Sequence, residues 1–241
     1  MSAPLILALP SKGRMKEQVE AWLGEAGLTL KAAGGARGYI AALAGVDGVE
    51  VRLLSAGMIA AALDAGEVHL GVTGEDLLRE RGEGAMSRIS LIAPLGFGPA
   101  DVVVAAPAAW IDVATMDDID DVAHAYLART GARLRVATKY LNLTRAFFAA
   151  KGVGDYRIVA SDGATEGAPA QGLAELIVDI TTTGATLKAN GLLILDDGVI
   201  LKSQFNLAAS AGAVWTGGQK RAAKDLLQRL GLPADLAQIA E

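Results

Sequence analysis

Cysteine is absent from this 241-residue sequence, and histidine occurs only twice. A disulfide-stapled domain needs cysteines, and a structural zinc site without them would have to be built from the two histidines and carboxylates, so we exclude both. We expect His69 and His124 to be structural or surface residues rather than catalytic ones. Basic residues are not in excess either, because 22 Lys and Arg stand against 27 Asp and Glu, for a net charge of −5. A general nucleic-acid binder is therefore excluded, whereas a local basic patch for small phosphorylated molecules is not.

Long hydrophobic runs are missing as well. The longest charge-free apolar run is the ten residues Val102–Ile111, which Pro107 interrupts, whereas a helix across a bilayer needs about 18 apolar residues. The amino terminus has no basic residue ahead of its first apolar run and reaches Lys12 and Arg14 soon after it, the reverse of a signal peptide. We therefore expect a cytoplasmic protein without a membrane span.

The residues that are present favour an α/β fold. With 52% hydrophobic and 20% charged residues, the chain can bury a substantial core. Short apolar runs typical of strands alternate with segments of helical periodicity, which is the order of elements in α/β proteins. The predicted strands are Leu5–Leu9, Val49–Leu54, Val68–Val72, Asp101–Ala106, Arg133–Ala137, Tyr156–Ala160 and Leu176–Ile180.

Helix signals lie between these runs. Met15, Val19, Trp22 and Leu23 stand at i, i+4, i+7 and i+8 and predict one amphipathic helix. A second is predicted near Tyr140, where apolar residues recur at i, i+3, i+7 and i+8. Ser55 is an N-cap candidate for another helix that stops at Gly66, and Thr216 is one for a helix near the carboxyl end.

Two segments are candidate boundaries within the chain. Pro94–Pro99 is dense in proline and glycine and lies between two predicted strands, which is typical of a hinge, and a second boundary falls near Asn190-Gly191. A chain of this length forms either one core or two small lobes.

The most informative segment joins a strand to a helix through a threonine-rich loop. The strand Leu176–Ile180 carries one acid, Asp179, and leads into the loop Thr181–Thr186, which opens a helix. Such a loop presents backbone N–H groups, hydroxyl donors and a positive helix end to one point, which suits a phosphate. Gly184 lets the backbone approach the anion, and Asp179 would accept hydrogen bonds from ribose hydroxyls. The alternative is that the loop only caps its helix.

This segment resembles the phosphoribosyl-pyrophosphate loop of phosphoribosyltransferases. The longer stretch from Glu166 to Leu192 is similar to the signature of the ATP phosphoribosyltransferase family, and the resemblance covers roughly residues 5 to 210. Further segments that resemble the family are Leu9–Arg14, Arg37-Gly38-Tyr39, Leu70–Asp76 and Val136–Tyr140.

The resemblance implies a reaction and a fold. The family joins N1 of the adenine of ATP to C1 of the ribose of phosphoribosyl pyrophosphate and releases pyrophosphate, as the first step of histidine biosynthesis. Its members have two α/β lobes similar to type II periplasmic binding proteins, with the active site in the cleft between them. By this likeness, residues 1–97 and 191–241 form the first lobe and residues 98–190 form the second.

The resemblance also implies roles for particular residues. Lys12, Arg14 and Arg37 of the first lobe are the expected catalytic cations, which would hold pyrophosphate or the phosphates of ATP together with Mg²⁺. The metal ligands are unknown. The expected substrate-binding residues are Gly74, Glu166, Asp179, Thr182, Thr183, Gly184, Ala185 and Thr186.

The sequence departs from the family at two places. Family members commonly have aspartate where this chain has Glu175, a change of one methylene that we expect to be tolerated. They often have an arginine and an aspartate where this chain reads Ser55-Ala56-Gly57-Met58. The electrostatic contact that this arginine would make to the leaving group must then come from Arg37, from Arg52 or from a neighbouring subunit.

Partners follow from the same likeness. We expect a short-form catalytic subunit that forms a homodimer, joins a regulatory subunit resembling histidyl-tRNA synthetase and has no high-affinity histidine site of its own. The alternatives are an autonomous enzyme, a non-catalytic anion-binding or solute-binding module of the same fold, and a phosphoribosyltransferase for another base.

Overall fold

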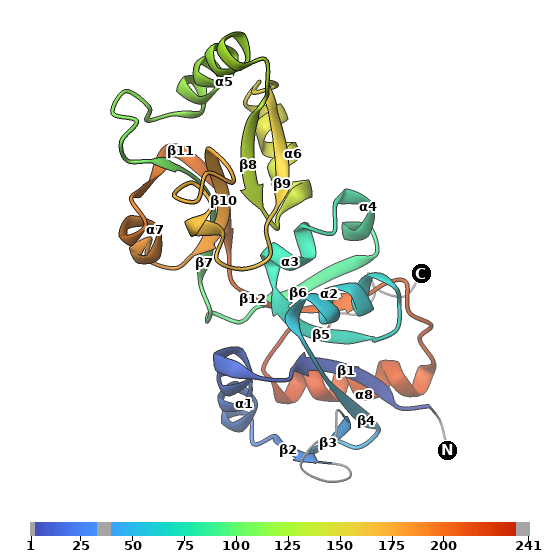
Figure 1. The fold of residues 1–241 in the computed structure, drawn as a ribbon. Helices are drawn as coiled ribbons and strands as arrows, with labels where there is room; N and C mark the ends of the chain where they lie inside the picture. Colours follow the sequence, from blue (N-terminus) through green and yellow to red (C-terminus); the bar gives the residue numbers. More distant parts are fainter. Residues whose placement is uncertain (1–2, 33–39, 235–241) are drawn as a thin grey trace. The chain divides into compact units, whose positions relative to one another are not determined.

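The computed structural model describes residues 3–32 and 40–234 and divides them into two α/β units. The first unit holds the described residues up to Gly98 and those from Gln204 onward, and the second holds Pro99–Ser203. The chain therefore passes between the units twice (Figure 1). The second crossing lies farther along the chain than the boundary predicted near residue 190, because the strand Leu192–Ser203 pairs within the second unit.

The first unit is built on a seven-stranded sheet of order β2-β3-β4-β1-β5-β12-β6, in which β1 pairs in parallel with β4 and β5. Its strands are β1 (Leu5–Pro10), β2 (Thr29–Ala32), β3 (Ile40–Ala44), β4 (Val49–Leu54), β5 (Leu70–Gly74), β6 (Ile89–Pro94) and β12 (Phe205–Ser210). Its helices are α1 (Gly13–Glu25), α2 (Ala56–Asp64), α3 (Glu75–Arg79), α4 (Glu83–Met86) and α8 (Gly217–Arg229).

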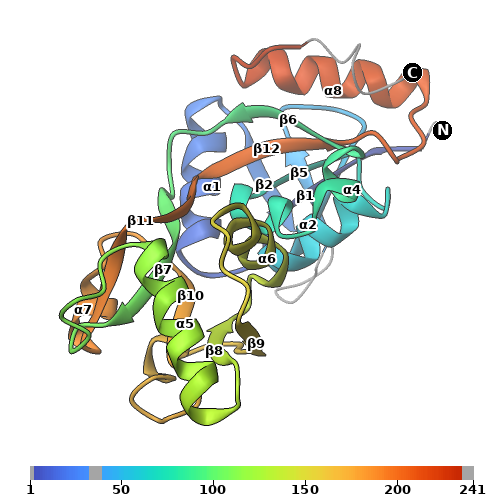
Figure 2. The ribbon, with the colours of Figure 1, turned by 90° about the horizontal axis from the view of Figure 1, so that it is seen from above.

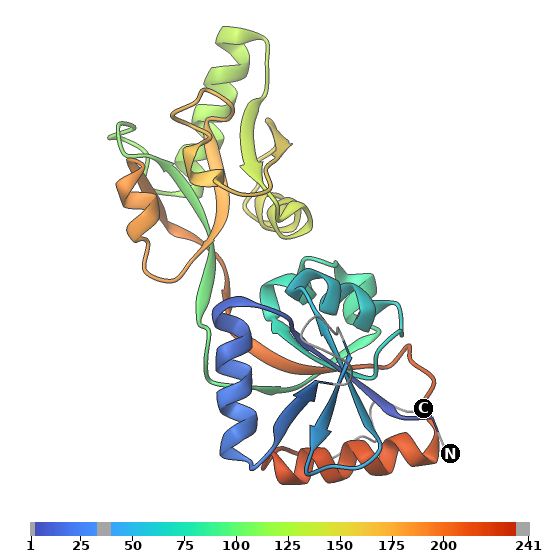
Figure 3. The same cartoon turned by 60° about the horizontal axis from the view of Figure 1, so that its bottom comes forward.

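Helices cover both faces of this sheet (Figure 3). One core cluster joins Val19 and Leu23 of α1 and Leu226 of α8 to the sheet, and another does so with Ile59 and Leu63 of α2. The apolar spacings within these helices predict this arrangement, because each presents one stripe to the strands.

The predicted helix caps are present in this unit. The Ser55 Oγ accepts a hydrogen bond from the Met58 N–H at 3.4 Å, and Thr216 forms a capping box with Gln219. Gly66 follows α2 with φ of +73°, the left-handed conformation that ends a helix.

The second unit is built on a five-stranded sheet of order β11-β7-β10-β8-β9. Its strands are β7 (Ala100–Pro107), β8 (Leu134–Thr138), β9 (Tyr156–Ala160), β10 (Leu176–Thr181) and β11 (Leu192–Ser203). Its helices are α5 (Met116–Thr130), α6 (Leu141–Ala150), α7 (Ala185–Ala189) and the 3₁₀ turn η1 (Thr165–Gly167). Figure 2 shows α7 on one side of this sheet and α5 on the other.

Each strand predicted from an apolar run is present, and these runs do not include β2, β3, β6, β11 and β12. In β11, the bulge between Ile194 and Val199 breaks the alternation of buried and exposed residues that identifies a strand in a sequence. No described helix is long and apolar enough to cross a bilayer.

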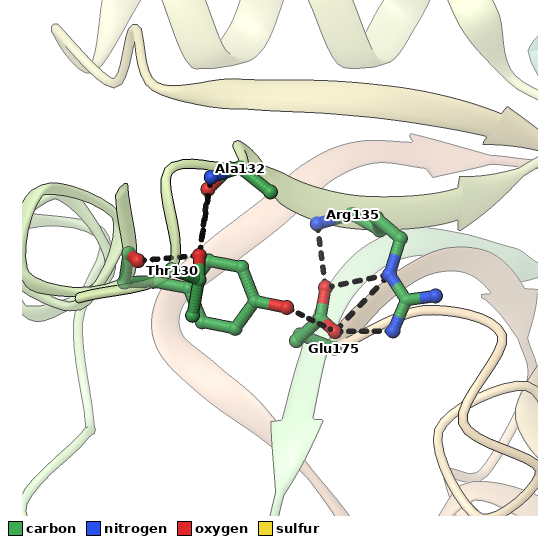
Figure 4. Close-up of polar contacts among 5 residues, drawn as sticks. Thr130, Ala132, Arg135 and Glu175 are labelled. Atoms are coloured by element: carbon green, nitrogen blue, oxygen red, sulfur yellow. Dashed lines mark hydrogen bonds and ion pairs between the residues drawn. The ribbon is translucent and has the colours of Figure 1, made fainter. Parts of the chain in front are cut away.

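A half-buried ion pair ties β8 to the start of β10 (Figure 4). The Glu175 carboxylate accepts hydrogen bonds from the Arg135 backbone N–H at 2.7 Å, from its guanidinium Nη2 at 2.5 Å, and from the Tyr126 hydroxyl at 3.2 Å. Burial raises the pKa of Glu175, but the hydrogen bonds and charge of Arg135 outweigh it, so the pKa lies below its usual 4.5.

We predict that Glu175→Gln destabilises the protein by about 1–3 kcal/mol at pH 7, because it removes the charge that binds Arg135 while keeping the shape. The folded-state pKa of Glu175 is lowered, so this stabilisation is complete above about pH 4.5 and is lost as the pH falls through the folded-state value. Denaturant titrations of both proteins from pH 7 to pH 3 check this. A difference that stays constant over this range would contradict it.

Candidate functional site

The conformation of the threonine-rich loop after β10 is stabilised by hydrogen bonds within the loop. The Gly184 N–H donates to the Thr181 hydroxyl at 2.9 Å, and the Ala185 N–H donates to the Thr183 hydroxyl at 3.4 Å. Gly184 has φ of +72° at the start of α7, a conformation that a residue with a Cβ rarely adopts. The predicted strand, loop and helix therefore follow one another in the structure.

A cavity of about 340 Å³ lies against this loop within the second unit. It brings together five of the predicted substrate-binding residues, two acids and three threonines, which are Glu166, Asp179, Thr182, Thr183 and Thr186. Ala100, Ile180, Thr181 and Leu187 complete the lining. Gly184 and Ala185 shape the loop through their backbone. The cavity combines hydroxyl donors with carboxylates and admits a small polar ligand.

Asp179 is half-buried at the carboxyl end of β10. Burial raises its pKa above the usual 3.8, and the charge of Glu166 raises it further. The Ile180 N–H, which donates to the Asp179 carboxylate at 2.8 Å, and the charge of Lys139 act in the opposite direction. A buried carboxylate with a perturbed pKa in a cavity is typical of a functional site.

Glu166 reaches the cavity from an unusual backbone turn. Ala164 has φ of +51° and is the one non-glycine residue with positive φ among those that the structure describes. The Ser161 and Thr165 hydroxyls lie 3.0 Å apart across this turn and stabilise it. Left-handed non-glycine residues cost about 1 kcal/mol or more and often occur at functional sites.

Lys139 was not among the predicted site residues, although it lies beside them. Val178 of β10 pairs in parallel with Thr138 of β8, so Asp179 and Lys139 follow at the same edge of the sheet. The signal that would find Lys139 in the sequence is its place directly after a predicted strand, where catalytic and binding residues of parallel sheets gather.

The predicted cations lie in the first unit. Lys12 and Arg14 flank Gly13 at the start of α1, where no side chain caps the first turn. Both side chains are exposed, and neither forms an ion pair with another described residue. Arg37 lies outside the described residues.

Arg52, one of the groups expected to replace the missing arginine, has other partners. Its guanidinium binds the Glu50 carboxylate at 3.0 Å and reaches the Glu67 carbonyl at 3.4 Å. Ser55 caps α2. Arg52, which was expected as one possible contact to the leaving group, therefore already binds Glu50 and Glu67.

Gly74 is buried at the junction of β5 and α3. A Cβ placed on Gly74 would lie 2.3 Å from the Asp76 Oδ1, although the backbone φ of −67° is open to any residue. Asp76 is 5% exposed, so its carboxylate has little room to move. Glycine is therefore needed at position 74 for a steric reason, because any larger residue would collide with the Asp76 carboxylate.

The histidines have structural surroundings. The His69 Nδ1 accepts from the Ile6 N–H at 3.1 Å, so its Nε2 carries the proton and donates to the Val214 carbonyl at 3.2 Å. Burial lowers the pKa of His69, which keeps the ring neutral. His124 is exposed on α5 beside Asp120 and Asp155.

The chain matches proteins of one family over most of its length. The family model described as ATP phosphoribosyltransferase matches residues 56–231. A protein of that name from Caulobacter vibrioides is 67% identical over 227 residues, which cover 94% of this chain and 71% of that protein. One from Bradyrhizobium sp. (strain ORS 278) is 58% identical over all of this chain and 74% of its own length.

Solved structures have the same fold. A chain described as part of the ATP phosphoribosyl transferase (HisG:HisZ) complex from Thermotoga maritima superposes with a TM-score of 0.71 at 24% identity, covering 98% of both chains. A histidine kinase sensor domain with similarity to periplasmic binding proteins reaches 0.50 at 14% identity, covering 95% of this chain and 91% of its own. The expected α/β fold resembling periplasmic binding proteins is confirmed.

We predict that Gly74→Ala destabilises the protein by about 1–3 kcal/mol, because the new Cβ must displace the buried Asp76 carboxylate. The control is Gly57→Ala in α2, where a Cβ has no atom within 4 Å and alanine favours the helix by up to about 1 kcal/mol. Thermal unfolding compares the two variants. Equal melting temperatures would contradict the steric role of Gly74.

Proposed function

This chain belongs to the ATP phosphoribosyltransferase family, and from that premise we propose how its described residues carry out the family's reaction. It is an enzyme that transfers the 5-phosphoribosyl group of phosphoribosyl pyrophosphate to N1 of the adenine of ATP, the first step of histidine biosynthesis. The observation that carries the proposal is the cavity beside the Thr181–Thr186 loop, where threonine hydroxyls suited to a phosphate lie together with a carboxylate suited to ribose hydroxyls.

In this proposal, the loop binds the 5′-phosphate of phosphoribosyl pyrophosphate. Thr182, Thr183 and Thr186 are exposed at the cavity wall, where their hydroxyls can donate to phosphate oxygens. The Ala185 N–H already donates to the Thr183 hydroxyl, so the N–H groups after it in the first turn of α7 are the backbone donors that we propose for the phosphate. Asp179 accepts hydrogen bonds from the ribose hydroxyls, and Glu166 faces the same part of the sugar.

The chemistry needs positioning more than acid–base catalysis. N1 of adenine carries a free lone pair, so its attack on C1 of the ribose requires no strong base. Negative charge develops on the departing pyrophosphate, and Lys12, Arg14 and Arg37 are the proposed cations that stabilise it. Preorganised charges of this kind each contribute about 10²–10³ in rate.

Magnesium is proposed to accompany the substrate. No group of three or more acidic or histidine side chains within residues 3–32 and 40–234 forms a metal cage. Mg²⁺ commonly binds one or two carboxylates and the phosphates of its substrate, and Asp179 and Glu166 in the cavity fit that donor set. When bound, the ion would neutralise charge on the pyrophosphate.

We propose that the chain forms a homodimer and joins a regulatory subunit resembling histidyl-tRNA synthetase. The Thermotoga maritima chain that it matches over 98% of both lengths is part of a HisG:HisZ complex, which supports a regulatory partner. The chain spans 71–74% of the length of these two curated relatives. Its cytoplasmic location stays a prediction.

We predict that Gly184→Val abolishes binding of phosphoribosyl pyrophosphate, because valine closes the approach to the loop and strains a backbone φ of +72°. The matched control is Gly191→Val, at the other end of α7, with φ of +69° and no atom within 4 Å of its Cβ. Calorimetry measures binding to both. If the two variants bind the ligand equally well, the loop is not the phosphate site.

We predict that Asp179→Asn lowers kcat/KM by about 10²–10³-fold, because it keeps the shape of the side chain and removes the charge. The assay follows pyrophosphate release, which should require both ATP and phosphoribosyl pyrophosphate in the presence of Mg²⁺. Release without ATP would refute the reaction, and wild-type kinetics of Asp179→Asn would refute the role of this residue.

The pH profile tests the same carboxylate. Because the pKa of Asp179 is raised above its usual 3.8, we predict that activity falls on the acidic side of the pH profile as Asp179 becomes protonated. The charge of Lys139 lowers this pKa, so its removal should move the acidic side of the profile to higher pH. Lys139→Met should therefore shift the acidic side, whereas Lys188→Met on the exposed part of α7 should not.

A further inference from the structure

The cavity beside the Thr181–Thr186 loop offers hydroxyl donors but little positive charge. The described residues that line it include four threonines and the carboxylates of Glu166 and Asp179, and none of them is a lysine or an arginine. Phosphoribosyl pyrophosphate carries a phosphate at one end and a pyrophosphate at the other. Because like charges repel in a partly buried site, a cation beside this cavity would strengthen the binding of either group.

Lys139 stands beside the cavity, at the end of the neighbouring strand β8. Ile177 of β10 pairs in parallel with Ala137 of β8, and both pack in the same core cluster as Leu187 of α7. Side chains alternate along a strand, so the positions two residues farther on, Asp179 and Lys139, return to that face of the sheet. The charge of Lys139 accordingly acts to lower the pKa of Asp179.

The backbone on both sides of Lys139 is fixed, whereas its ammonium is available. The hydroxyl of the buried Thr138 accepts from the Tyr140 N–H at 2.9 Å, and the Thr138 carbonyl accepts from the Ser161 N–H at 3.0 Å. Lys139 is exposed and forms no ion pair with another described residue. Its Nζ lies 5.0 Å from the centre of the Tyr140 ring, a weak contact that an anion can replace.

The loop and Lys139 flank Asp179 from opposite sides. A Cβ on Gly184 would lie 3.6 Å from the Ile194 Cδ1 of β11, so the loop lies toward that strand. Figure 1 likewise shows α7 beside β11. Strand β8, which carries Lys139 at its end, pairs with β10 on the other side.

This arrangement gives the substrate a direction. In the proposed function the loop binds the 5′-phosphate and Asp179 binds the ribose hydroxyls. The ribose ring places C1 opposite C4, which carries the arm with the 5′-phosphate. The C1 end of the bound sugar therefore extends from Asp179 toward β8, where Lys139 stands.

We propose that the Lys139 ammonium is a catalytic cation that binds the pyrophosphate group on C1 and stabilises its departure. The inference rests on the proposed function and adds a cation from the second unit to those proposed in the first. As the bond from N1 of adenine to C1 forms, the bond from C1 to the pyrophosphate oxygen breaks. The electron pair of the broken bond stays on that oxygen, and Lys139 keeps its proton throughout.

Binding measurements on the whole chain separate the two ends of the substrate. Calorimetry in the presence of Mg²⁺ uses inorganic pyrophosphate and ribose 5-phosphate as separate probes. Lys139→Met should weaken pyrophosphate binding by roughly tenfold or more, as expected for the loss of one charged hydrogen bond, and leave ribose 5-phosphate binding unchanged. Lys139→Arg should retain pyrophosphate binding. The control Lys188→Met removes an exposed lysine of α7 and should change neither affinity.

Kinetics test whether the contact acts in the reaction. At a pH above the acidic side of the profile, where Asp179 is ionised in both proteins, Lys139→Met should lower kcat by about 10²-fold. Lys139→Arg should recover most of this loss, because it restores the charge. Thermal unfolding confirms that the variants fold.

Three outcomes would overturn the inference. If Lys139→Met shifts the acidic side of the profile but keeps kcat above it, Lys139 acts only through Asp179. If the variant loses affinity for ribose 5-phosphate as much as for pyrophosphate, Lys139 does not face the leaving group. If Lys139→Arg is as slow as Lys139→Met, the charge is not what matters.

Failure of the proposed function has a different signature. A wild-type chain that releases no pyrophosphate from phosphoribosyl pyrophosphate and ATP would overturn the reaction and this inference together. Normal release by the wild type, with an unchanged kcat in Lys139→Met, would overturn the role of Lys139 and leave the reaction standing.

Discussion

The position of β10 between β7 and β8 determines the geometry of the cavity beside the Thr181–Thr186 loop. Its antiparallel pairing runs from Ile177 to Thr181 against β7, and its parallel pairing joins Leu176–Val178 to β8. Both registers are fixed by buried apolar residues, because a slip of one residue would turn the buried side chains to the other face. Asp179 and the loop therefore start from a rigid strand end. The Arg135–Glu175 ion pair secures the opposite end of the same strand.

The cavity balances opposing electrostatic effects on one carboxylate. Burial and Glu166 favour the protonated form of Asp179, while the Ile180 N–H and Lys139 favour the ionised form, which the proposed contact to ribose hydroxyls needs. A fully exposed aspartate would be ionised more easily but would bind its ligand in competition with water. Partial burial strengthens the contact at the cost of a raised pKa.

Local patterns in the sequence predict much of this fold and of its site. The apolar runs predict the strands of both sheet centres, and the spacing of Asp179 to Thr186 predicts the loop, because these features depend on residues close together in the chain. Features set by distant residues were missed. Strand β11 depends on pairing with β7 across a bulge. Gly74 and Asp76 are near neighbours in the chain, but the steric need for glycine depends on the side-chain conformation of Asp76, which no local pattern shows.

Two hollows of the second unit lie at opposite ends of β10. Glu175 lines a groove beside α5 just before the strand begins, whereas Asp179 and the loop line the cavity where it ends. Six residues of extended strand, Leu176–Thr181, cover about 20 Å. The groove beside α5 and the cavity beside the Thr181–Thr186 loop are therefore separate hollows at the two ends of one strand. Because β10 is hydrogen-bonded to β7 on one side and to β8 on the other, its neighbours within the sheet hold the strand that positions Asp179.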